Sequence, residues 1–326
     1  MKRTESIDYF WNLLKEDDVL LAPMAGVTDA AFRHICAGSG ARVMFTEMVS
    51  AKGMVYGNKN TEKLIFLGPR EDHTAVQIFG SDEAFLSRAV GEYLNGSAFA
   101  FIDINMGCPV KKVTSNGEGS ALLRDTEKLY RAAKSVVDAS DKPVSAKIRL
   151  GIDGRINAAE NVQALEEAGV GMVTVHGRTA EMYYSGHADY GQISLAVRSA
   201  KRIPVIANGD VSDYSGYLNI MTDTGAAGAM IGRAAMGNPF IFAEIAAAKR
   251  GEAYVPPTNA EKMAAALEHF EFLLEYKGEH TACSEFRRHF CYYTKGMPGG
   301  AALRSQVSSY EKAEQFTDLI RSLIDC

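Results

Sequence analysis

A thiol follows an apolar run in the stretch DINMGCPVKK, residues 103–112, where the chain must turn. Pro109 fixes the backbone after Cys108, and Lys111 and Lys112 come shortly behind. A thiol with an ordinary pKa of about 8.5 is mostly protonated at neutral pH, so Cys108 can donate a proton to a carbon that has just received a hydride. Two nearby lysines would instead favour the thiolate and a nucleophilic role. The residues alone leave both roles open.

Four further polar residues interrupt or end apolar runs: Gln77, Asn105, Lys147 and His176. Burying such a group without a partner costs on the order of 1–3 kcal/mol, so something polar should meet each one. Amides, an ammonium and an imidazole suit a planar ring with alternating N–H and C=O groups, and the isoalloxazine ring of a flavin fits that description. No GxGxxG motif follows the first apolar run, so a Rossmann-type nicotinamide site is not supported.

Two glycine-containing segments end the last two apolar runs: ANGD at residues 207–210 and IGRAAMGNPF at residues 231–240. Gly209 and Gly232 allow close approach of a ligand to the backbone, and Arg233 adds a fixed cation. These are the parts of the phosphate site that α/β barrels build after strands 7 and 8. Either glycine taken singly is more simply a turn former, but the pair predicts a phosphorylated ligand.

The elements that must position these residues form one repeated pattern. Between apolar or β-branched runs lie amphipathic segments with helical spacing and acidic or Ser/Thr/Asn starts. Strand, helix, strand repeated in this way predicts an α/β fold with a closed (β/α)8 TIM barrel, whose active face is formed by the carboxyl ends of the strands. An open, doubly wound sheet is the alternative, but it would leave two runs unused. The runs lie at residues 19–26, 43–49, 74–80, 101–107, 144–151, 172–178, 204–210 and 229–234.

The pattern changes at residues 254–259, which carry a proline pair, and the remainder predicts helices alone. We therefore expect a barrel domain at residues 1–250 and a small all-helical domain at residues 251–326. Asn259 is expected to cap the first long helix of that domain, and a serine at 308 or 309 to cap the last.

Composition bounds the function classes. The chain has 326 residues, 47% hydrophobic and 23% charged, which is typical of a globular protein. A signal peptide and a membrane-length apolar run are both missing from the sequence, so we expect a cytoplasmic protein. The cysteines form no CxxC pair and no Cys/His ligand spacing, so we expect no metal site, and we expect the four other than Cys108 to be small buried hydrophobes: Cys36, Cys283, Cys291 and Cys326.

A net charge of −5 argues against nucleic-acid binding by bulk charge but allows a local basic surface. Between Glu285 and Glu311 the chain carries cations and aromatic residues and no acidic residue. Such a segment can contact phosphates and stack on nucleotides, although an ordinary solvated helix face has the same composition. Its cations are Arg287, Arg288, Lys295 and Arg304, interleaved with His289, Phe290, Tyr292 and Tyr293.

Over nearly its whole length the chain resembles bacterial tRNA-dihydrouridine synthases, most closely their B subgroup. The resemblance rests on motifs in order: APMAGVTDAAFR, TEM, QIFGSD, DINMGCPVKKV, GSALL, KIRLG, TVHGRT, IANGDV and IGRAAMGNPFIF, then RRHFCYYTKGMPGGAALR in the helical region. It implies that FMN is held by Pro23, Met24, Ala25, Gln77, Asn105, Lys147, His176, Asn208, Gly209, Asp210, Gly232 and Arg233. It also makes Cys108 the proton donor.

The resemblance further implies reduction of a uridine in tRNA, in the D-loop, to 5,6-dihydrouridine. NADPH would reduce FMN, hydride would pass from flavin N5 to C6, and Cys108 would protonate C5. The implied partners are tRNA and NADPH, with no membrane or metal, and we expect a monomer. Because the uridine must leave its stack, base flipping is expected. The expected substrate or tRNA contacts are Arg149, Arg178, Arg287, Arg288, Lys295 and Arg304, with Arg33, Lys111 and Lys112 as candidates to extend them.

Two rival interpretations stay open. The first is an FMN barrel acting on a small molecule, of the dihydroorotate dehydrogenase type. The second is a catalytically silent barrel that binds RNA. A small substrate has no need of the extra helical residues 260–326 with their basic, aromatic segment, which favours tRNA over the first rival.

Overall fold

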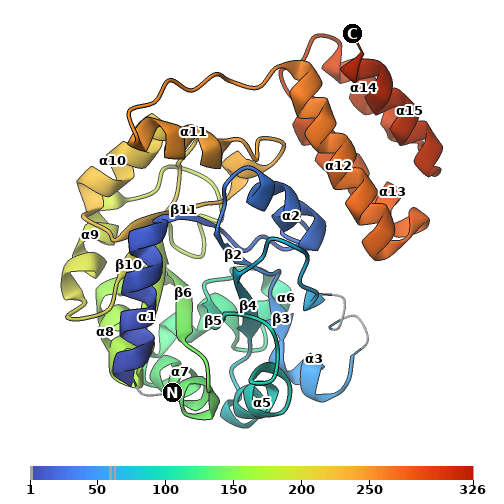
Figure 1. Cartoon of the computed structure of the whole chain (residues 1–326). Helices are drawn as coiled ribbons and strands as arrows, with labels where there is room; N and C mark the ends of the chain where they lie inside the picture. Colours follow the sequence, from blue (N-terminus) through green and yellow to red (C-terminus); the bar gives the residue numbers. More distant parts are fainter. Residues whose placement is uncertain (1–2, 59–60, 62–63, 326) are drawn as a thin grey trace. The chain divides into compact units, whose positions relative to one another are not determined.

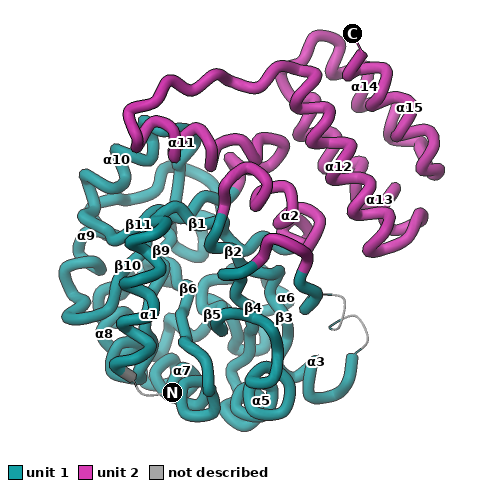
Figure 2. Tube along the Cα trace, in the orientation of Figure 1, with its two compact units in different colours: residues 1–25, 42–67, 72–232 teal, residues 26–41, 68–71, 233–326 magenta. Residues whose placement is uncertain are grey.

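The computed structural model describes residues 3–58, 61 and 64–325. Its chain trace forms two compact units (Figures 1 and 2). The first unit consists of residues 1–25, 42–67 and 72–232, and the second of residues 26–41, 68–71 and 233–326. This division differs from the predicted boundary at 250/251, because residues 233–250 and the segment 26–41 group with the C-terminal helices. The functional assignment of the two predicted domains stays a prediction.

The first unit is a closed barrel of parallel strands. Along the sheet the strands follow the order β2-β1-β11-β10-β9-β6-β5-β4, and β2 also pairs with β4, which closes the ring. Every predicted run overlaps one of these strands, so the closed (β/α)8 barrel is confirmed and the open sheet is excluded. The strands are β1 (Val19–Leu21), β2 (Val43–Phe45), β4 (His73–Phe79), β5 (Phe101–Met106), β6 (Val144–Arg149), β9 (Met172–His176), β10 (Val205–Asn208) and β11 (Gly228–Ile231).

Helices surround the barrel (Figure 1), and most of them begin at an aspartate cap. Asp82, Asp125, Asp189 and Asp213 each accept a backbone N–H from the first turn of the helix that follows. A carboxylate here satisfies a free donor and complements the helix dipole. The helices are α5 (Glu83–Ala89), α7 (Thr126–Ala139), α8 (Ala158–Ala168), α9 (Tyr190–Ser199) and α10 (Tyr214–Thr224).

The core at the amino-terminal end of the strands is rich in aromatic rings. Phe10, on helix α1 (Arg3–Glu16), is fully buried and meets Phe101 edge to face with ring centroids 5.2 Å apart. Phe45 meets Phe101 from the other side at 5.5 Å. The remaining elements of the unit are β3 (Val49–Ser50), α3 (Ala51–Val55), the π-helical turn Val90–Leu94, α6 (Lys111–Thr114), the 3-10 turn Gly119–Arg124, and the hairpin β7 (Gly151–Ile152) with β8 (Arg155–Ile156).

The second unit is helical around a cluster of phenylalanines. Phe270, Phe286, Phe290 and Phe316 are all 0% exposed and lie in mutual ring contact. Helix α2, which follows the first barrel strand in the chain, packs against α12 within this unit. The helices are α2 (Ala30–Gly38), the 3-10 turn Arg233–Ala235, α11 (Ile241–Lys249), α12 (Asn259–Lys277), α13 (Glu279–Tyr293), α14 (Gly300–Val307) and α15 (Ala313–Ile324).

Both helix caps predicted for this unit are wrong. Helix α12 is capped by Thr258 in a capping box with Glu261, so Asn259 is its first helical residue. Helix α15 is preceded by Lys312, not by a serine. The hydroxyls of Ser308 and Ser309 instead donate to the carbonyls of Ser305 and Gln306 at the end of α14. They therefore close one helix and do not begin the next.

Candidate active site at the carboxyl ends of the barrel strands

Strand register brings the predicted polar residues to one end of the barrel. Asn105 on β5 is paired in register with Lys147 on β6, and His176 on β9 with Asn208 on β10. Parallel strands present their carboxyl ends on the same face, so residues far apart in sequence become neighbours. Asn105 and Lys147 are half-buried, whereas His176 and Asn208 are buried.

Lys147 is held by the next amide around the ring. Its Nζ donates to Oδ1 of Asn208 at 3.0 Å, and Nδ2 of Asn208 donates to the carbonyl of Met230 at 2.7 Å. Burial lowers the pKa of Lys147 to about 8, and the neighbouring Arg149 charge acts in the same direction. Most of the lysine is therefore still charged at neutral pH, in a place where its charge is only partly hydrated.

Cys108 lies on a tightly fixed turn after β5. Its backbone N–H donates to Oδ1 of Asn105 at 2.9 Å, and its carbonyl accepts from the N–H of Ser120 at 2.9 Å. Gly119, at φ 57°, approaches so closely that a Cβ there would lie 2.7 Å from the Cys108 carbonyl oxygen. The local fold thus sets where the thiol can point.

The electrostatics of this turn favour a protonated thiol. Burial raises the pKa of the Cys108 thiol, although a backbone hydrogen bond from Val110 and the charges of Arg149 and Lys147 act in the opposite direction. Lys111 and Lys112 begin helix α6 and are exposed to solvent. The balance supports a proton donor over the thiolate nucleophile that the two lysines had suggested.

A buried carboxylate stands behind these groups. Gln77, Asp103 and Ser145 are partners in register on β4, β5 and β6. Asp103 is 0% exposed and accepts from Nε2 of Gln77 at 2.7 Å and from the hydroxyl of Ser145 at 2.5 Å. The sequence interpretation missed Asp103. The available signal was an acidic residue within the apolar strand sequence FIDINM, because such a residue needs partners.

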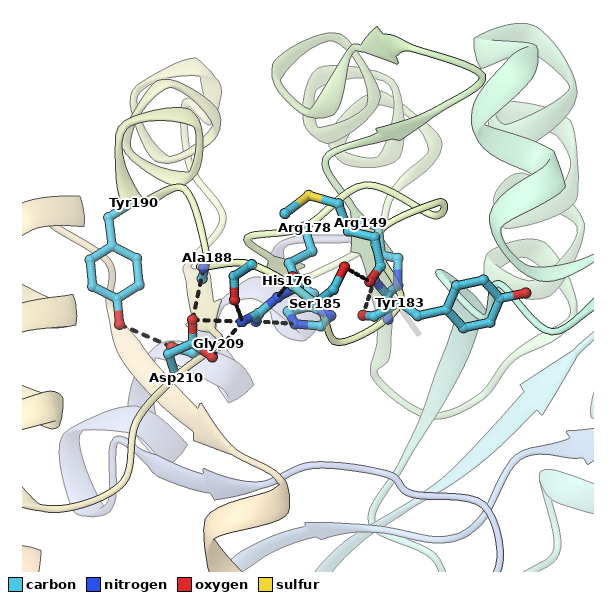
Figure 3. Close-up of polar contacts among 11 residues, drawn as sticks. Arg149, His176, Arg178, Tyr183, Ser185, Ala188, Tyr190, Gly209 and Asp210 are labelled. Atoms are coloured by element: carbon cyan, nitrogen blue, oxygen red, sulfur yellow. Dashed lines mark hydrogen bonds and ion pairs between the residues drawn. The ribbon is translucent and has the colours of Figure 1, made fainter.

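Two buried arginines fix the loop between β9 and α9 (Figure 3). Arg149 donates to the carbonyls of Gly107 at 3.0 Å and of Thr179 and Tyr183 at 2.9 Å. Arg178 is 1% exposed, and it donates to the carbonyl of Ser185 at 2.9 Å. A buried guanidinium needs several acceptors, and main-chain carbonyls supply them. Both arginines therefore lie inside the unit and not on an open cationic surface.

Asp210 completes the arginine network (Figure 3). Its carboxylate accepts from Nη2 of Arg178 at 2.7 Å and from the N–H of Ala188 at 2.7 Å. Gly209 before it has φ 138°, and a Cβ there would lie 2.7 Å from the side chain of Ala188. Glycine is thus needed at position 209 for both backbone conformation and space. In this structure Asp210 holds the loop between β9 and α9 in place, and its expected contact with a cofactor stays a prediction.

The loops after β1 and β11 lie beside each other. The N–H of Ala22 donates to the carbonyl of Ile231, and a Cβ on Gly232 would meet only Ala22 at 3.6 Å and the sulfur of Met24 at 3.7 Å. Pro23 and Met24 are half-buried and Ala25 is exposed. Arg233 belongs to the second unit, and its predicted role in the phosphate site stays a prediction.

Comparison with known proteins places this architecture in a family. A family model described as "Dihydrouridine synthase (Dus)" matches residues 20–325. The chain belongs to the dihydrouridine synthase family. The barrel described above is therefore the barrel of a dihydrouridine synthase family member.

Relatives match the chain over almost its full length. A "Probable tRNA-dihydrouridine synthase 1" of Synechocystis is 39% identical over 94% of this chain and 86% of its own. A "Probable tRNA-dihydrouridine synthase" of Rhodobacter capsulatus is 38% identical over 95% of this chain and 96% of its own. A "tRNA-dihydrouridine synthase B" of Xanthomonas axonopodis is 36% identical over 94% of this chain and 92% of its own. A solved FabK mutant of Thermotoga maritima covers 70% of the chain at 14% identity with a TM-score of 0.42, and the assignment does not depend on it.

The four cations expected to bind tRNA in the second unit differ in their surroundings. Arg287 donates twice to the carbonyl of Tyr310, at 3.1 and 2.8 Å, and Arg304 donates to the carbonyl of Thr294 at 3.3 Å. Arg288 and Lys295 are exposed to solvent, whereas the other two cations donate hydrogen bonds to main-chain carbonyls of the same unit.

Several expected surface roles are wrong in this structure. His289 is 2%, Phe290 0% and Tyr293 1% exposed, so these rings are part of the helical core and do not form a stacking surface. Arg33 is 1% exposed and pairs with Glu71 at 2.6 Å, which removes it from the cationic track. Both errors arise because a residue's type does not show which face of its helix is buried.

Three further expectations concern the other cysteines, metal binding and membrane-spanning helices. Cys36 and Cys283 are buried and Cys291 is half-buried, while Cys326 lies outside the described residues. Within residues 3–58, 61 and 64–325, no group of His, Cys, Asp or Glu side chains is arranged to hold a metal ion. In the same part of the chain, no helix combines the length and apolar character that crossing a membrane requires.

Proposed function

We propose that this chain reduces a uridine of tRNA to 5,6-dihydrouridine, with FMN bound in the barrel and NADPH as the electron source. Membership of the dihydrouridine synthase family supports the reaction class. The observation that carries the chemistry is the position of Cys108, which is held by Asn105 on a fixed turn and kept mostly protonated by burial. A cytoplasmic, monomeric protein remains our expectation from the sequence.

The residues at the strand ends fit a flavin. Asn105, Cys108 and Lys147 are the half-buried polar groups among buried neighbours, so they form the part of the site that a ligand can reach. Gly232 leaves space beside Met24 that any side chain would fill. When bound, FMN would supply the hydride that C6 of the uracil ring receives. Lys147 would hold negative charge that develops on the ring system, because a poorly hydrated ammonium stabilises such charge strongly.

Cys108 would act as the general acid. As C6 gains a hydride, electron density shifts toward C5, and the thiol proton moves to C5 while the S–H bond breaks. The thiolate that remains would be stabilised by the Val110 N–H and by the charges of Arg149 and Lys147. Solvent then restores the thiol. Uracil gains one hydride and one proton in total, which balances the oxidation of one NADPH to NADP⁺.

The second unit would contribute to holding tRNA. Arg288 and Lys295 are exposed cations suited to phosphate oxygens. Lys111 and Lys112 on α6 of the barrel unit are exposed as well. We assign Arg149 and Arg178 a positioning role in addition to any contact with the substrate, because both hold the loop after β9. The target base would be flipped from its stack into the site.

One assay tests the proposal directly. The purified full-length protein is incubated with NADPH and tRNA that lacks dihydrouridine, and the modified position is then mapped. We expect dihydrouridine to form only when both NADPH and tRNA are present. Absence of dihydrouridine, together with rapid NADPH-dependent reduction of a free pyrimidine carboxylic acid, would overturn the proposal in favour of a small-molecule flavoenzyme.

A further inference from the structure

A relay of hydrogen bonds runs from Asp103 to the backbone of Cys108. Gln77 donates through Nε2 to Asp103 and accepts through Oε1 from Nδ2 of Asn105 at 2.8 Å. Asn105 in turn accepts through Oδ1 from the N–H groups of Cys108 at 2.9 Å and Gly107 at 3.2 Å. Two side-chain amides thus link a buried carboxylate to the turn that carries the thiol.

The two ends of this relay have fixed polarity. A backbone N–H can only donate, and an ionised carboxylate can only accept. An amide presents a donor on one side and an acceptor on the other, so only one orientation of Gln77 and of Asn105 satisfies both ends. Asp103 is also the acceptor for Ser145, which fixes its rotamer from the opposite side.

We propose that Asp103 is a positioning residue that sets the amide orientation of Gln77 and Asn105 and thereby the placement of the Cys108 turn. Asp103 acts through these two residues. Its relevance to catalysis rests on the proposed function, but the relay itself is a property of this chain that can be measured without turnover.

Protonation of Asp103 would remove the fixed polarity at that end of the relay. A protonated carboxyl can donate as well as accept, so it no longer enforces one orientation of the Gln77 amide, and an inverted pair of amides would turn the NH₂ of Asn105 toward the N–H of Cys108. Burial raises the pKa of Asp103 to about 6, although hydrogen bonds from Gln77 and Ser145 and the Lys147 charge oppose this. Lys147 titrates near 8, and burial raises the pKa of Cys108, so neither follows the same pH range.

The test uses protein labelled with ¹⁵N-cysteine, in which the backbone signal of Cys108 is identified by its loss in Cys108→Ala. In the wild type this signal should move between about pH 5 and 7, with a midpoint near the pKa of Asp103. Asp103→Asn does not titrate, so its signal should show no transition in this pH range. Asp103→Leu removes the acceptor and should displace the signal throughout.

Two controls make the result decisive. Ser145→Ala removes a hydrogen bond to the carboxylate without touching the relay, so it should keep the transition and raise its midpoint. If the Cys108 signal does not change with pH, or if Asp103→Asn keeps the wild-type transition, the positioning role is overturned, even where Asp103→Leu does not fold. Product formation is measured in parallel. An intact relay with no dihydrouridine would refute the proposed function alone, and a pH-insensitive Cys108 signal in an active enzyme would refute the relay alone.

Discussion

Two buried polar clusters, one in each unit, differ in how their groups are partnered. In the barrel, the Asp103 carboxylate meets two donors, and each further amide of the relay is paired with the next. In the helical unit, His269 and His289 lie with ring centroids 4.5 Å apart, beside Phe32. Among the described residues, Nε2 of His269 and Nδ1 of His289 are buried without a hydrogen-bond partner.

The two clusters differ in whether their contacts fix the orientation of a side chain. Each bond of the barrel network requires a particular donor and acceptor, so the network can position a reacting group. The imidazoles contact aromatic rings, and His269 meets the Tyr293 hydroxyl at 3.3 Å, an arrangement that serves packing more than orientation. A buried polar atom without a hydrogen-bond partner costs free energy. The two unpartnered imidazole nitrogens therefore lower the stability of the helical core and fix no donor or acceptor in place.

The clusters also respond oppositely to acid. Burial raises the pKa of Asp103 from 3.8 to about 6, so the stability contributed by its neutral form is complete below the ordinary value and is lost as pH rises through 6. Burial lowers the pKa of His289 from 6.5 to about 4. Its stability contribution is present above 6.5 and is lost as pH falls toward 4.

The largest expected effect comes from removing the group that the barrel network holds. Cys108→Ala should lower dihydrouridine formation by roughly 10²–10⁴-fold, since the proton donor is lost, while NADPH oxidation with an artificial acceptor is kept. Cys291→Ala, at a half-buried thiol of the helical unit, is the matched control and should leave product formation unchanged. Equal product formation by wild type and Cys108→Ala would remove the general-acid assignment.

Changing the helical cluster should alter acid stability by a smaller amount. His289→Leu is apolar and of similar volume, so it should remove the part of the acid sensitivity that this imidazole causes, about 1–2 kcal/mol at pH 5.5. Hydrogen exchange of α12 and α13 at pH 5.5 and 7.5, corrected for intrinsic rates, measures it. The exposed His280→Gln on the same helix should behave as wild type. Identical pH dependence in His289→Leu and wild type would show that His289 is not responsible.

The barrel cluster should show the reverse dependence. Asp103→Asn removes a carboxylate that is ionised while buried, so it should stabilise the barrel by about 1–3 kcal/mol at pH 7.5 and by roughly half as much at pH 5. Urea unfolding at the two pH values checks this. A variant that is less stable than wild type at pH 7.5 would mean that the hydrogen bonds to the carboxylate outweigh its desolvation.

The fold could be predicted from the sequence because each barrel strand is a short apolar run and the segments between the runs have helical spacing. The meeting of polar residues at the strand ends could be predicted as well, since Lys147 and Asn208 stand out against apolar surroundings. The role of Asp103 could not be predicted, because its partners lie 26 residues before it and 42 after it. Their meeting depends on strand register, which composition does not specify.

Burial of cations and rings was predictable only in part. Arg149 and Arg178 are held by main-chain carbonyls, which every sequence supplies, so no residue pattern marks them as buried. The helical core is a different case. Phe286, Phe290 and Tyr293 recur at four- and three-residue spacing on α13, and that periodicity indicates a buried face. Weighing charge and aromatic content above periodicity led to the wrong stacking surface.

The smallest expected effect concerns an exposed cation on the surface of the helical unit. Arg288 is exposed, and its guanidinium lies so close to Gly26 that a Cβ there would be 3.0 Å from Nη2. If Arg288 contacts one phosphate, Arg288→Gln should weaken tRNA binding a few-fold for all sequences and lower the salt dependence of log Kd by about one charge. Arg321→Gln, at an exposed position on α15, is the matched control for lost charge. Because surface charge is screened whereas buried polarity is not, raising the salt concentration should erase the effect of Arg288→Gln and leave those of Asp103→Asn and His289→Leu intact. An Arg288→Gln effect that persists at high salt would instead place this guanidinium in a closed contact.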